Sequence, residues 1–213
     1  MSVGIDSVRT FYDGYLDKLT TTNSRHMWVF KSFEKLLPKH CNVLDIGCGT
    51  GITSKNLAYN ARNVTAIDLS PVLIEYAKTY NSHFNAVKYI VGDIADFKSE
   101  EKFDVITMVD VLEHILPESM SKVFQVLKNV SHNNTRIYLN IPSGDLLDWL
   151  WKNKPDNRQI VDTPYSHAQI IEWFSRIDFI PAYYQLYWQQ YVEYLFITKK
   201  SYDKTFKGVF CNG

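Results

Sequence analysis

The sequence predicts an α/β fold: a doubly wound, mostly parallel sheet with helices on both faces and an antiparallel hairpin at its C-terminal edge. Three observations support this fold. Short apolar runs alternate with helix-like segments from residue 42 to residue 142, which is typical of parallel sheets connected by helices. A glycine-rich turn at 47–51 joins the first strand of that series to its first helix. The runs 179–188 and 191–199 have almost no chain between them, so they are expected to pair antiparallel.

The N-terminal half begins with a helical segment. Residues 5–37 carry apolar side chains at helical spacing, and Pro38 closes the segment. Ser70 and Pro71 supply an N-cap and a first-turn proline for a later helix. The elements expected after Pro38 are a strand at 42–47, a helix to about residue 60, a strand at 63–69 and a helix at 71–80.

The C-terminal half continues the alternation as far as Pro142. Its expected elements are strands at 87–92, 103–111 and 135–141, with a helix from Pro117 to about residue 130. Residues 143–165 break the rhythm and indicate an inserted helix and loop. Ser166 and Gln169 form a capping-box pattern that opens a last helix before the terminal hairpin.

Composition and charge fit one domain over 1–213. The 23 basic and 23 acidic residues cancel, so the chain has no general attraction to phosphate backbones, and nucleic acid is not an expected partner. No apolar run approaches the roughly 18 residues of a membrane span, and the N-terminus lacks a signal-peptide pattern. We therefore expect a cytoplasmic protein with no membrane partner. Cys41, Cys48 and Cys211 are too few for a disulfide framework, no metal site is predicted, and the oligomeric state stays open.

The strongest chemical signal is the run VLDIGCGTG, Val43 to Gly51. A buried strand ends there in a glycine-rich turn that opens a helix. Glycine lets backbone amides approach a ligand closely, and a helix N-terminus favours a negatively charged group. The competing interpretation is a tight strand–helix turn that binds nothing.

Two aspartates stand at the ends of the next two strands. Asp68 follows Gly51 by 17 residues and can accept hydrogen bonds from both hydroxyls of a ribose. Asp93 follows Gly92 and can accept a hydrogen bond from an exocyclic amine. Either aspartate alone is more often a turn former or a helix cap. Together with the turn, they predict a nucleoside site at the carboxyl edge of the sheet.

A nicotinamide cofactor is the alternative ligand for this edge. Its fingerprint is G-x-G-x-x-G, but Ile52 stands where the third glycine belongs, and the third glycine is Gly51. This spacing disfavours a nicotinamide-dependent oxidoreductase.

The ordered motifs resemble those of the class I S-adenosylmethionine-dependent methyltransferases, of the small-molecule type. VLDIGCGTG resembles the first motif of that family, AIDLSPVLIEYAK its second-strand motif and GDIADF its third, while FDVITMVDVLEHI and IYLNIP resemble the fourth and fifth strand segments. The resemblance covers about 40–142. It implies a Rossmann-like sheet of seven strands with the last one antiparallel. It also implies S-adenosyl-L-methionine as methyl donor and S-adenosyl-L-homocysteine as product.

The resemblance further implies residue roles. The glycine-rich turn would hold the methionine portion of the donor, Asp68 the ribose, and Asp93 with the Ile94 backbone the adenine. Side chains of an N-terminal lid would close over the donor. The donor-site candidates are Asp45, Gly47, Cys48, Gly49, Thr50, Gly51, Asp68, Leu69, Asp93, Ile94, Val109 and Asp110, with Tyr12, Tyr15 and Arg25 from the lid.

The chain is therefore expected to divide by role into a helical lid (1–38), a donor-binding core (40–142), a substrate-cap insert (143–165) and a C-terminal helix and hairpin (166–200). The insert and the C-terminal part are rich in apolar and aromatic side chains. Ordinary packing explains much of this, and the remainder predicts a partly apolar or aromatic acceptor pocket. These side chains are Leu146, Leu147, Trp149, Leu150, Trp151, Trp173, Phe174, Phe179, Tyr183, Tyr184, Tyr187, Trp188, Tyr191, Tyr194 and Phe196.

We expect transfer of a methyl group to an O or N atom of a small molecule. A hydroxyl acceptor usually needs a general base, and histidine suits neutral pH. His114, beside Glu113 after the fourth strand, is the first candidate, and His167 is the second. Local packing or capping is the alternative for both. A catalytically silent module that only binds the donor is the alternative for the whole chain.

Overall fold

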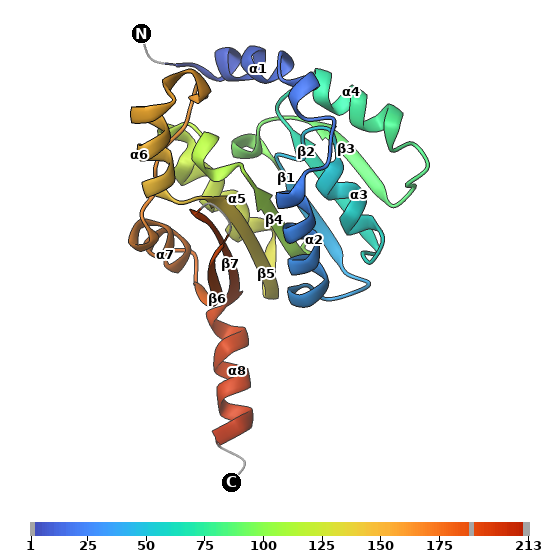
Figure 1. Ribbon diagram of the computed structural model, residues 1–213. Helices are drawn as coiled ribbons and strands as arrows, with labels where there is room; N and C mark the ends of the chain where they lie inside the picture. The colour runs from blue at the N-terminus through green and yellow to red at the C-terminus, as the bar shows by residue number, and fades with distance from the viewer. Residues whose placement is uncertain (1–2, 188–189, 211–213) are drawn as a thin grey trace.

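The computed structural model covers residues 3–187 and 190–210, and it describes the side chains of the last helix as far as residue 204. Seven strands form one sheet within this part of the chain, in the order β3-β2-β1-β4-β5-β7-β6 (Figure 1). The strands are β1 (Asn42–Ile46), β2 (Asn63–Asp68), β3 (Val87–Val91), β4 (Phe103–Val109), β5 (Ser131–Pro142), β6 (Phe179–Tyr187) and β7 (Tyr191–Thr198). The α-helices are α1 (Ile5–Asp13), α2 (Ser24–Leu36), α3 (Ile52–Ala58), α4 (Pro71–Tyr80), α5 (Met120–Val130), α6 (Gly144–Asn153), α7 (His167–Ser175) and α8 (Lys199–Phe210).

Strand pairing confirms the predicted topology. Strands β1 to β5 are parallel, whereas β7 pairs antiparallel with both β5 and β6. The strand order reverses at β1, which lies between β2 and β4. In doubly wound sheets, ligands bind beyond the carboxyl ends of the strands at such a reversal.

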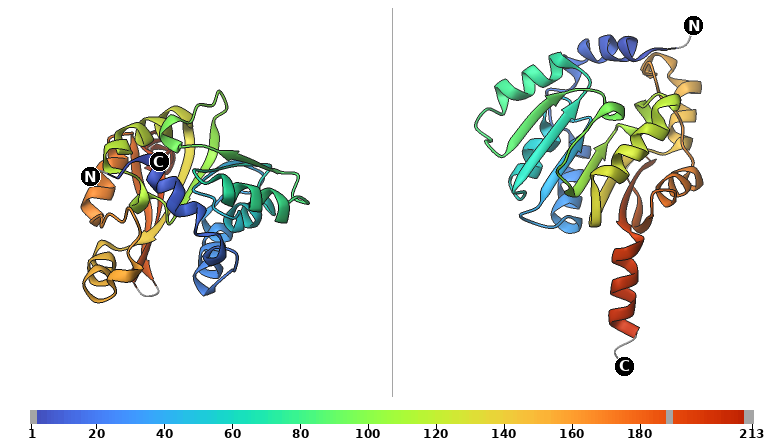
Figure 2. Two further views of the ribbon diagram at one scale, coloured as in Figure 1. Left: turned by 90° about the horizontal axis from the view of Figure 1, so that it is seen from above. Right: turned by 180° about the vertical axis from the view of Figure 1, so that it is seen from behind.

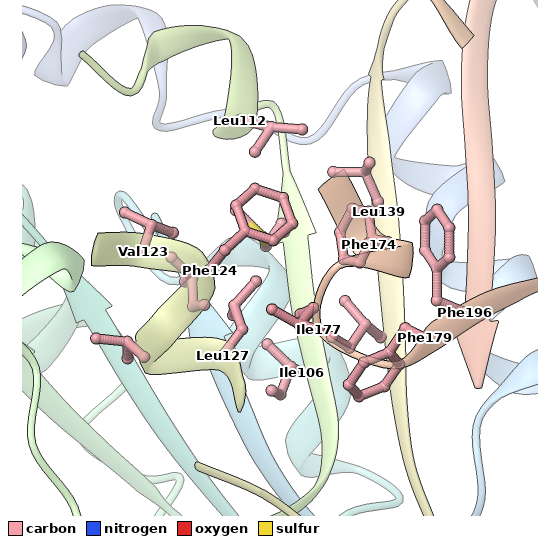
Figure 3. Packing of buried hydrophobic residues seen from close by; sticks show 14 of the residues in the cluster. Ile106, Leu112, Val123, Phe124, Leu127, Leu139, Phe174, Ile177, Phe179 and Phe196 are labelled. Carbon is pink, nitrogen blue, oxygen red and sulfur yellow. The ribbon is translucent and has the colours of Figure 1, made fainter. Parts of the chain in front are cut away.

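Side chains alternate between the two faces of the sheet, as a strand requires. On one face, residues of β4, β5 and β7 pack against α5 and α7; Phe124, Phe174 and Phe196 belong to this cluster (Figure 3). The Phe174 and Phe196 rings stack with centroids 3.9 Å apart. The other face packs against α2 and α3 through side chains such as Phe33 and Leu57. Each fully buried side chain of this size contributes about 1.5–3 kcal/mol.

The N-terminal segment differs from the single helical stretch expected at 5–37. Helix α1 ends at Asp13, a 3₁₀ turn follows at Leu16–Lys18, and α2 starts only at Ser24. Asn23 caps α2: its side chain accepts from the backbone N–H of His26, and the His26 ring accepts from the backbone N–H of Asn23. The reciprocal cap fixes a helix start in the middle of the apolar pattern.

Smaller differences concern element ends. Strand β4 stops at Val109 because Asp110 adopts φ +55°, and the segment from Pro117 begins as a 3₁₀ turn before α5. Strand β5 is longer than expected, and α8 was not expected as a helix. The predicted caps of α4 and α7, at Ser70 and Ser166, are confirmed. Trp188 and Cys211 lie outside the described residues.

The first and the last helix lie at opposite ends of the molecule (Figures 1 and 2). Helix α1 lies across one end, above the sheet, and α8 projects from the opposite end. Among the described residues, no helix has the length and apolar character needed to cross a membrane.

Candidate active site

A cavity of about 300 Å³ lies at the carboxyl ends of β1 to β4, beneath the N-terminal segment. It brings together residues from motifs that are far apart in sequence. The predicted donor-site residues that line it are Gly47, Cys48, Gly49, Thr50, Asp68, Leu69, Asp93, Ile94, Val109, Asp110, Tyr12, Tyr15 and Arg25. His114 lines it as well.

Glycine is required in the turn after β1 for steric reasons. Gly47 has φ +65°, and a Cβ added there would lie 2.3 Å from Val111 Cγ2. The amides of Gly47 and Cys48 both donate to the carbonyl oxygen of Ile67, and the Gly49 amide donates to Asp68. These amides therefore bind the turn to β2. The sequence suggested that they would face a ligand, but their hydrogen bonds are used within the protein.

Asp68 combines a structural role with exposure to the cavity. One carboxylate oxygen accepts from the Gly49 amide at 2.8 Å and the other from the Ser70 amide at 2.9 Å. Burial raises the pKa of the Asp68 carboxyl, and these two hydrogen bonds oppose the rise. Each oxygen keeps further acceptor capacity for a hydroxyl in the cavity.

Asp93 has a similar arrangement at the end of β3. Its side chain accepts from the backbone N–H of Ala95 at 2.8 Å and so caps the short 3₁₀ turn Ile94–Asp96. The cap holds Asp93 and the neighbouring Ile94 backbone at the cavity wall. The next two strand ends after β1 therefore both carry a carboxylate at the cavity.

Asp45 and Gly51 lie behind the cavity and are not among its lining residues. The Asp45 carboxylate is buried and accepts from the hydroxyls of Thr53, Ser54 and Thr107. It connects β1 to α3 and β4, so its position in the motif reflects support of the turn. Gly51, at φ +80°, is the N-cap of α3.

Arg25 and Asp110 form an ion pair at the cavity wall. Arg25 Nη1 donates to Asp110 Oδ1 at 3.0 Å and to Asn140 Oδ1 at 3.1 Å. Its guanidinium carbon lies 4.6 Å from the centroid of the Tyr191 ring. The sequence suggested both charged residues separately; their pairing across 85 positions was not visible in it.

Hydrogen bonds made by Tyr12, Asp13 and Leu19 hold the N-terminal segment over the cavity. The Thr50 hydroxyl donates to the carbonyl oxygen of Leu19, and the Ser70 hydroxyl donates to Asp13. The Tyr12 hydroxyl donates to Gln159 Oε1 at 2.9 Å. This segment therefore covers the cavity as a lid.

His114 is nearly buried, with 11% of its side chain exposed. Its Nδ1 lies 2.8 Å from the carbonyl oxygen of Val161, and its Nε2 lies 3.2 Å from the amide nitrogen of Gln159. Burial lowers the pKa of the imidazole, although the Val161 carbonyl and Asp162 oppose this effect. Burial thus favours the neutral form of this ring at the cavity.

His167 is not among the cavity-lining residues. Its Nδ1 lies 2.9 Å from the Tyr194 hydroxyl, and its ring stacks on that tyrosine. It starts α7 after the Ser166 cap. These contacts fit the packing interpretation of His167.

The insert 143–165 reaches the cavity through the loop after α6, whereas its composition suggested the apolar side chains of α6 itself. Gln159 lines the cavity, and Val161 packs beside it against Val8 and Leu116. Among the described residues, none of the apolar side chains of α6 and none of the aromatic side chains named between 173 and 187 or between 191 and 196 lines the cavity. Trp149 is half exposed. Gln159 itself was missed because nothing in its sequence neighbourhood distinguishes it from a surface glutamine.

The geometry can be compared with known proteins. Residues 43–134 match a family model described as "Methyltransferase domain". The mitochondrial ubiquinone biosynthesis O-methyltransferase of Schizosaccharomyces pombe is 37% identical over 109 residues, which are 49% of this chain and 39% of that protein. The ubiquinone biosynthesis O-methyltransferase of Rickettsia akari is 30% identical over 134 residues, 62% of this chain and 48% of its own. The chain thus spans less than half the length of these curated relatives.

Solved structures agree in fold. The N-methyltransferase NodS of Bradyrhizobium japonicum, solved with S-adenosyl-L-homocysteine, superposes with a TM-score of 0.73 at 15% identity, covering 90% of this chain and 98% of that one. A structure described as a DhpI–SAH complex gives 0.73 at 16% identity, covering 91% and 96%. Residues 43–134 therefore match a methyltransferase domain, and these structures confirm the predicted fold.

Proposed function

We propose that this chain transfers a methyl group from S-adenosyl-L-methionine to an oxygen or nitrogen atom of a small acceptor and releases S-adenosyl-L-homocysteine. The observation that carries the proposal is the cavity at the strand reversal, where the glycine-rich turn meets Asp68, Asp93 and the Arg25–Asp110 pair. The O-methyltransferase relatives support the same reaction class.

The proposed donor position follows from the polar groups in the order of the strands. Asp68 accepts from the ribose hydroxyls, and Asp93 with the Ile94 backbone recognises the adenine. The 47–50 turn lies along the methionine portion. Arg25 and Asp110 carry the charges that complement the donor's carboxylate and ammonium groups.

The donor supplies the reactive group, because its sulfonium makes the methyl carbon electrophilic. The protein has to align the acceptor with that carbon and exclude water. The lid formed by residues 5–36 performs the second task in this proposal. His114 removes the proton of a hydroxyl acceptor, for which a neutral ring at the cavity is suited.

We further propose an acceptor that is partly apolar and is not a nucleic acid. The support is a cavity wall that includes Val8, Leu69 and Leu116, together with the zero net charge of the chain. A cytoplasmic location remains a prediction from the sequence. Cell fractionation tests it.

Incubation with methyl-labelled donor and a panel of phenols, catechols and amines tests the function. We expect one or more panel members to gain a single methyl group, detected by mass, with matching release of S-adenosyl-L-homocysteine. Donor binding without any transfer would favour the silent module. Label transfer to bulk RNA or DNA at rates that rival the best small molecule would contradict the acceptor class.

A further inference from the structure

We infer that Gln159 positions the acceptor of the proposed reaction. Its amide is hydrogen-bonded to the basic nitrogen of His114, and the hydroxyl of a bound acceptor takes the place of that amide. The inference rests on the proposed methyl transfer. It adds to the proposed active site a residue that lies outside the family motifs. It also restricts the proposed acceptors to compounds with a hydroxyl group.

Hydrogen-bond directions around Gln159 are fixed by their chemistry. The carbonyl oxygen of Val161 can only accept, so the His114 Nδ1 at 2.8 Å carries the ring proton. The Nε2 of the neutral ring is then an acceptor, and the Gln159 amide nitrogen at 3.2 Å donates to it. The Gln159 Oε1 accepts from the Tyr12 hydroxyl at 2.9 Å. The donor and the acceptor of each hydrogen bond in this series are therefore fixed.

Three segments meet at this point of the cavity. Tyr12 belongs to α1 of the lid, His114 to the 3₁₀ turn after β4, and Gln159 to the insert, and all three line the cavity. The surrounding cluster is apolar, formed by Val8, Leu116 and Val161 with partly buried neighbours. A polar spot in an apolar wall fits an acceptor with an apolar body and a hydroxyl at its reacting end.

When the acceptor hydroxyl replaces the Gln159 amide at His114, every polar group involved keeps a hydrogen-bond partner. The acceptor O–H donates to His114 Nε2, while its oxygen accepts the Gln159 N–H that the imidazole has released. In the transfer step, the oxygen forms a bond to the methyl carbon and the carbon–sulfur bond breaks, with its electron pair left on sulfur. The hydroxyl proton goes to Nε2 and leaves to solvent with the product.

Neighbouring acids complete the surroundings of His114. Glu113 Oε1 lies 3.7 Å from Nε2, and Asp162 Oδ1 lies 3.9 Å from Nδ1. The Tyr12 ring is 6.0 Å away from the other side. Glu113 Oε2 and Asp162 Oδ1 are buried oxygens without a hydrogen-bond partner among the described residues. Asp162 favours the imidazolium after proton transfer, whereas the Gln159 amide favours the neutral ring before it.

Imidazole NMR of the full chain tests the inference without any need for turnover. The wild-type His114 should show the Nδ1–H tautomer. Gln159→Ala should raise the pKa of His114 by about half a unit or more, and Gln159→Glu by about a unit or more, because each removes the donor that favours the neutral ring. Donor affinity should stay within about twofold. Asn157→Ala, an exposed change in the same loop, should match the wild type.

Catechol serves as the acceptor probe, added to protein loaded with S-adenosyl-L-homocysteine. It should shift the His114 Nε2 resonance, and about tenfold more should be needed in Gln159→Ala. An unchanged His114 titration in Gln159→Ala, or no catechol response in the wild type, would overturn the inference. So would a parallel loss of thermal stability and donor affinity, which marks a packing role. A protein that shows these NMR responses yet transfers no methyl group would refute the proposed function alone.

Discussion

Glu113 is buried beside Asp162 and His114, and its protonation should control stability across neutral pH. Burial, with a further contribution from Asp162, raises the pKa of this carboxyl from 4.5 to about 8. Between these values the folded state holds a proton that the unfolded state has lost, so stability falls as pH rises from about 4.5 to about 8. The slope can reach about 1.4 kcal/mol per pH unit.

Glu113→Gln should flatten this dependence, since the amide has no proton to lose. Urea unfolding at pH 5, 6.5 and 8 measures the difference. The variant should gain stability relative to wild type as pH rises, whereas the exposed Glu118→Gln should follow the wild-type curve. Parallel pH curves for wild type and Glu113→Gln would show that the carboxyl is already ionised in the fold.

Asp68 provides the residue-scale test of the donor site. Asp68→Asn removes the charge that strengthens its ribose contacts, so donor binding should weaken by about 1.5–3 kcal/mol in calorimetry. The variant also loses part of its hold on the Gly49 and Ser70 amides, so its stability falls too. Asp104→Asn is the matched control, because Asp104, in β4, accepts from the backbone N–H of Asn42 at the start of β1. It should lose stability and keep donor affinity; equal affinity in both variants would remove Asp68 from the donor site.

His114 should affect turnover and leave donor binding unchanged. His114→Gln removes the proton acceptor, so turnover with a hydroxyl compound should fall by about 10²-fold or more. Donor affinity from calorimetry is the internal control. Full turnover across the pH range would show that positioning alone drives the transfer.

At the scale of elements, the turn between β1 and α3 depends on the left-handed backbone of Gly51. A Cβ at this position would lie 2.5 Å from the Tyr89 hydroxyl and 2.8 Å from Asn81 Nδ2. Gly51→Ala should therefore destabilise the protein by about 1–3 kcal/mol through backbone strain and steric conflict. Gly92→Ala, whose added Cβ would meet only Ile67 at 3.5 Å, should change the unfolding free energy by less than about 0.5 kcal/mol. Similar losses in both variants would contradict the steric argument.

Elements that are specified by local chemistry could be predicted from the sequence. The caps at Ser70 and Ser166 depend on residues within three positions, and the hairpin follows from the short connection before Tyr191. The break between α1 and α2 was missed, because the apolar spacing continues through it and the cap uses His26 where a glutamate or glutamine is usual.

The candidate site was predictable where one motif supplies both the backbone and the side chain. Asp68 and Asp93 end strands, so the sheet alone places them at the cavity. Contacts between distant segments were not predictable. The Tyr12–Gln159 hydrogen bond spans 147 positions, and its partners have no distinctive sequence neighbourhood. The prediction that the apolar residues of α6 line the acceptor pocket failed for a related reason. Amphipathic spacing indicates that one face of a helix is buried, but it does not identify the segment that covers this face.

At the scale of the whole molecule, donor binding should stabilise the end that carries the cavity and leave the end that carries α8 unchanged. The first part of the lid, residues 5–19, is hydrogen-bonded to Thr50, Ser70 and Gln159, all at the carboxyl end of the sheet. Helix α8 projects from the opposite end (Figure 1). Saturation at a hundred times Kd adds about 2.7 kcal/mol of stability, and only the segments around the donor are expected to gain local protection beyond this global effect. Hydrogen exchange followed by mass spectrometry should therefore slow most in residues 5–19 and 159–163. Exchange in α8 should change little, and its peptides are the internal control. Uniform slowing across the chain would show that the lid is already as stable as the core before the donor binds.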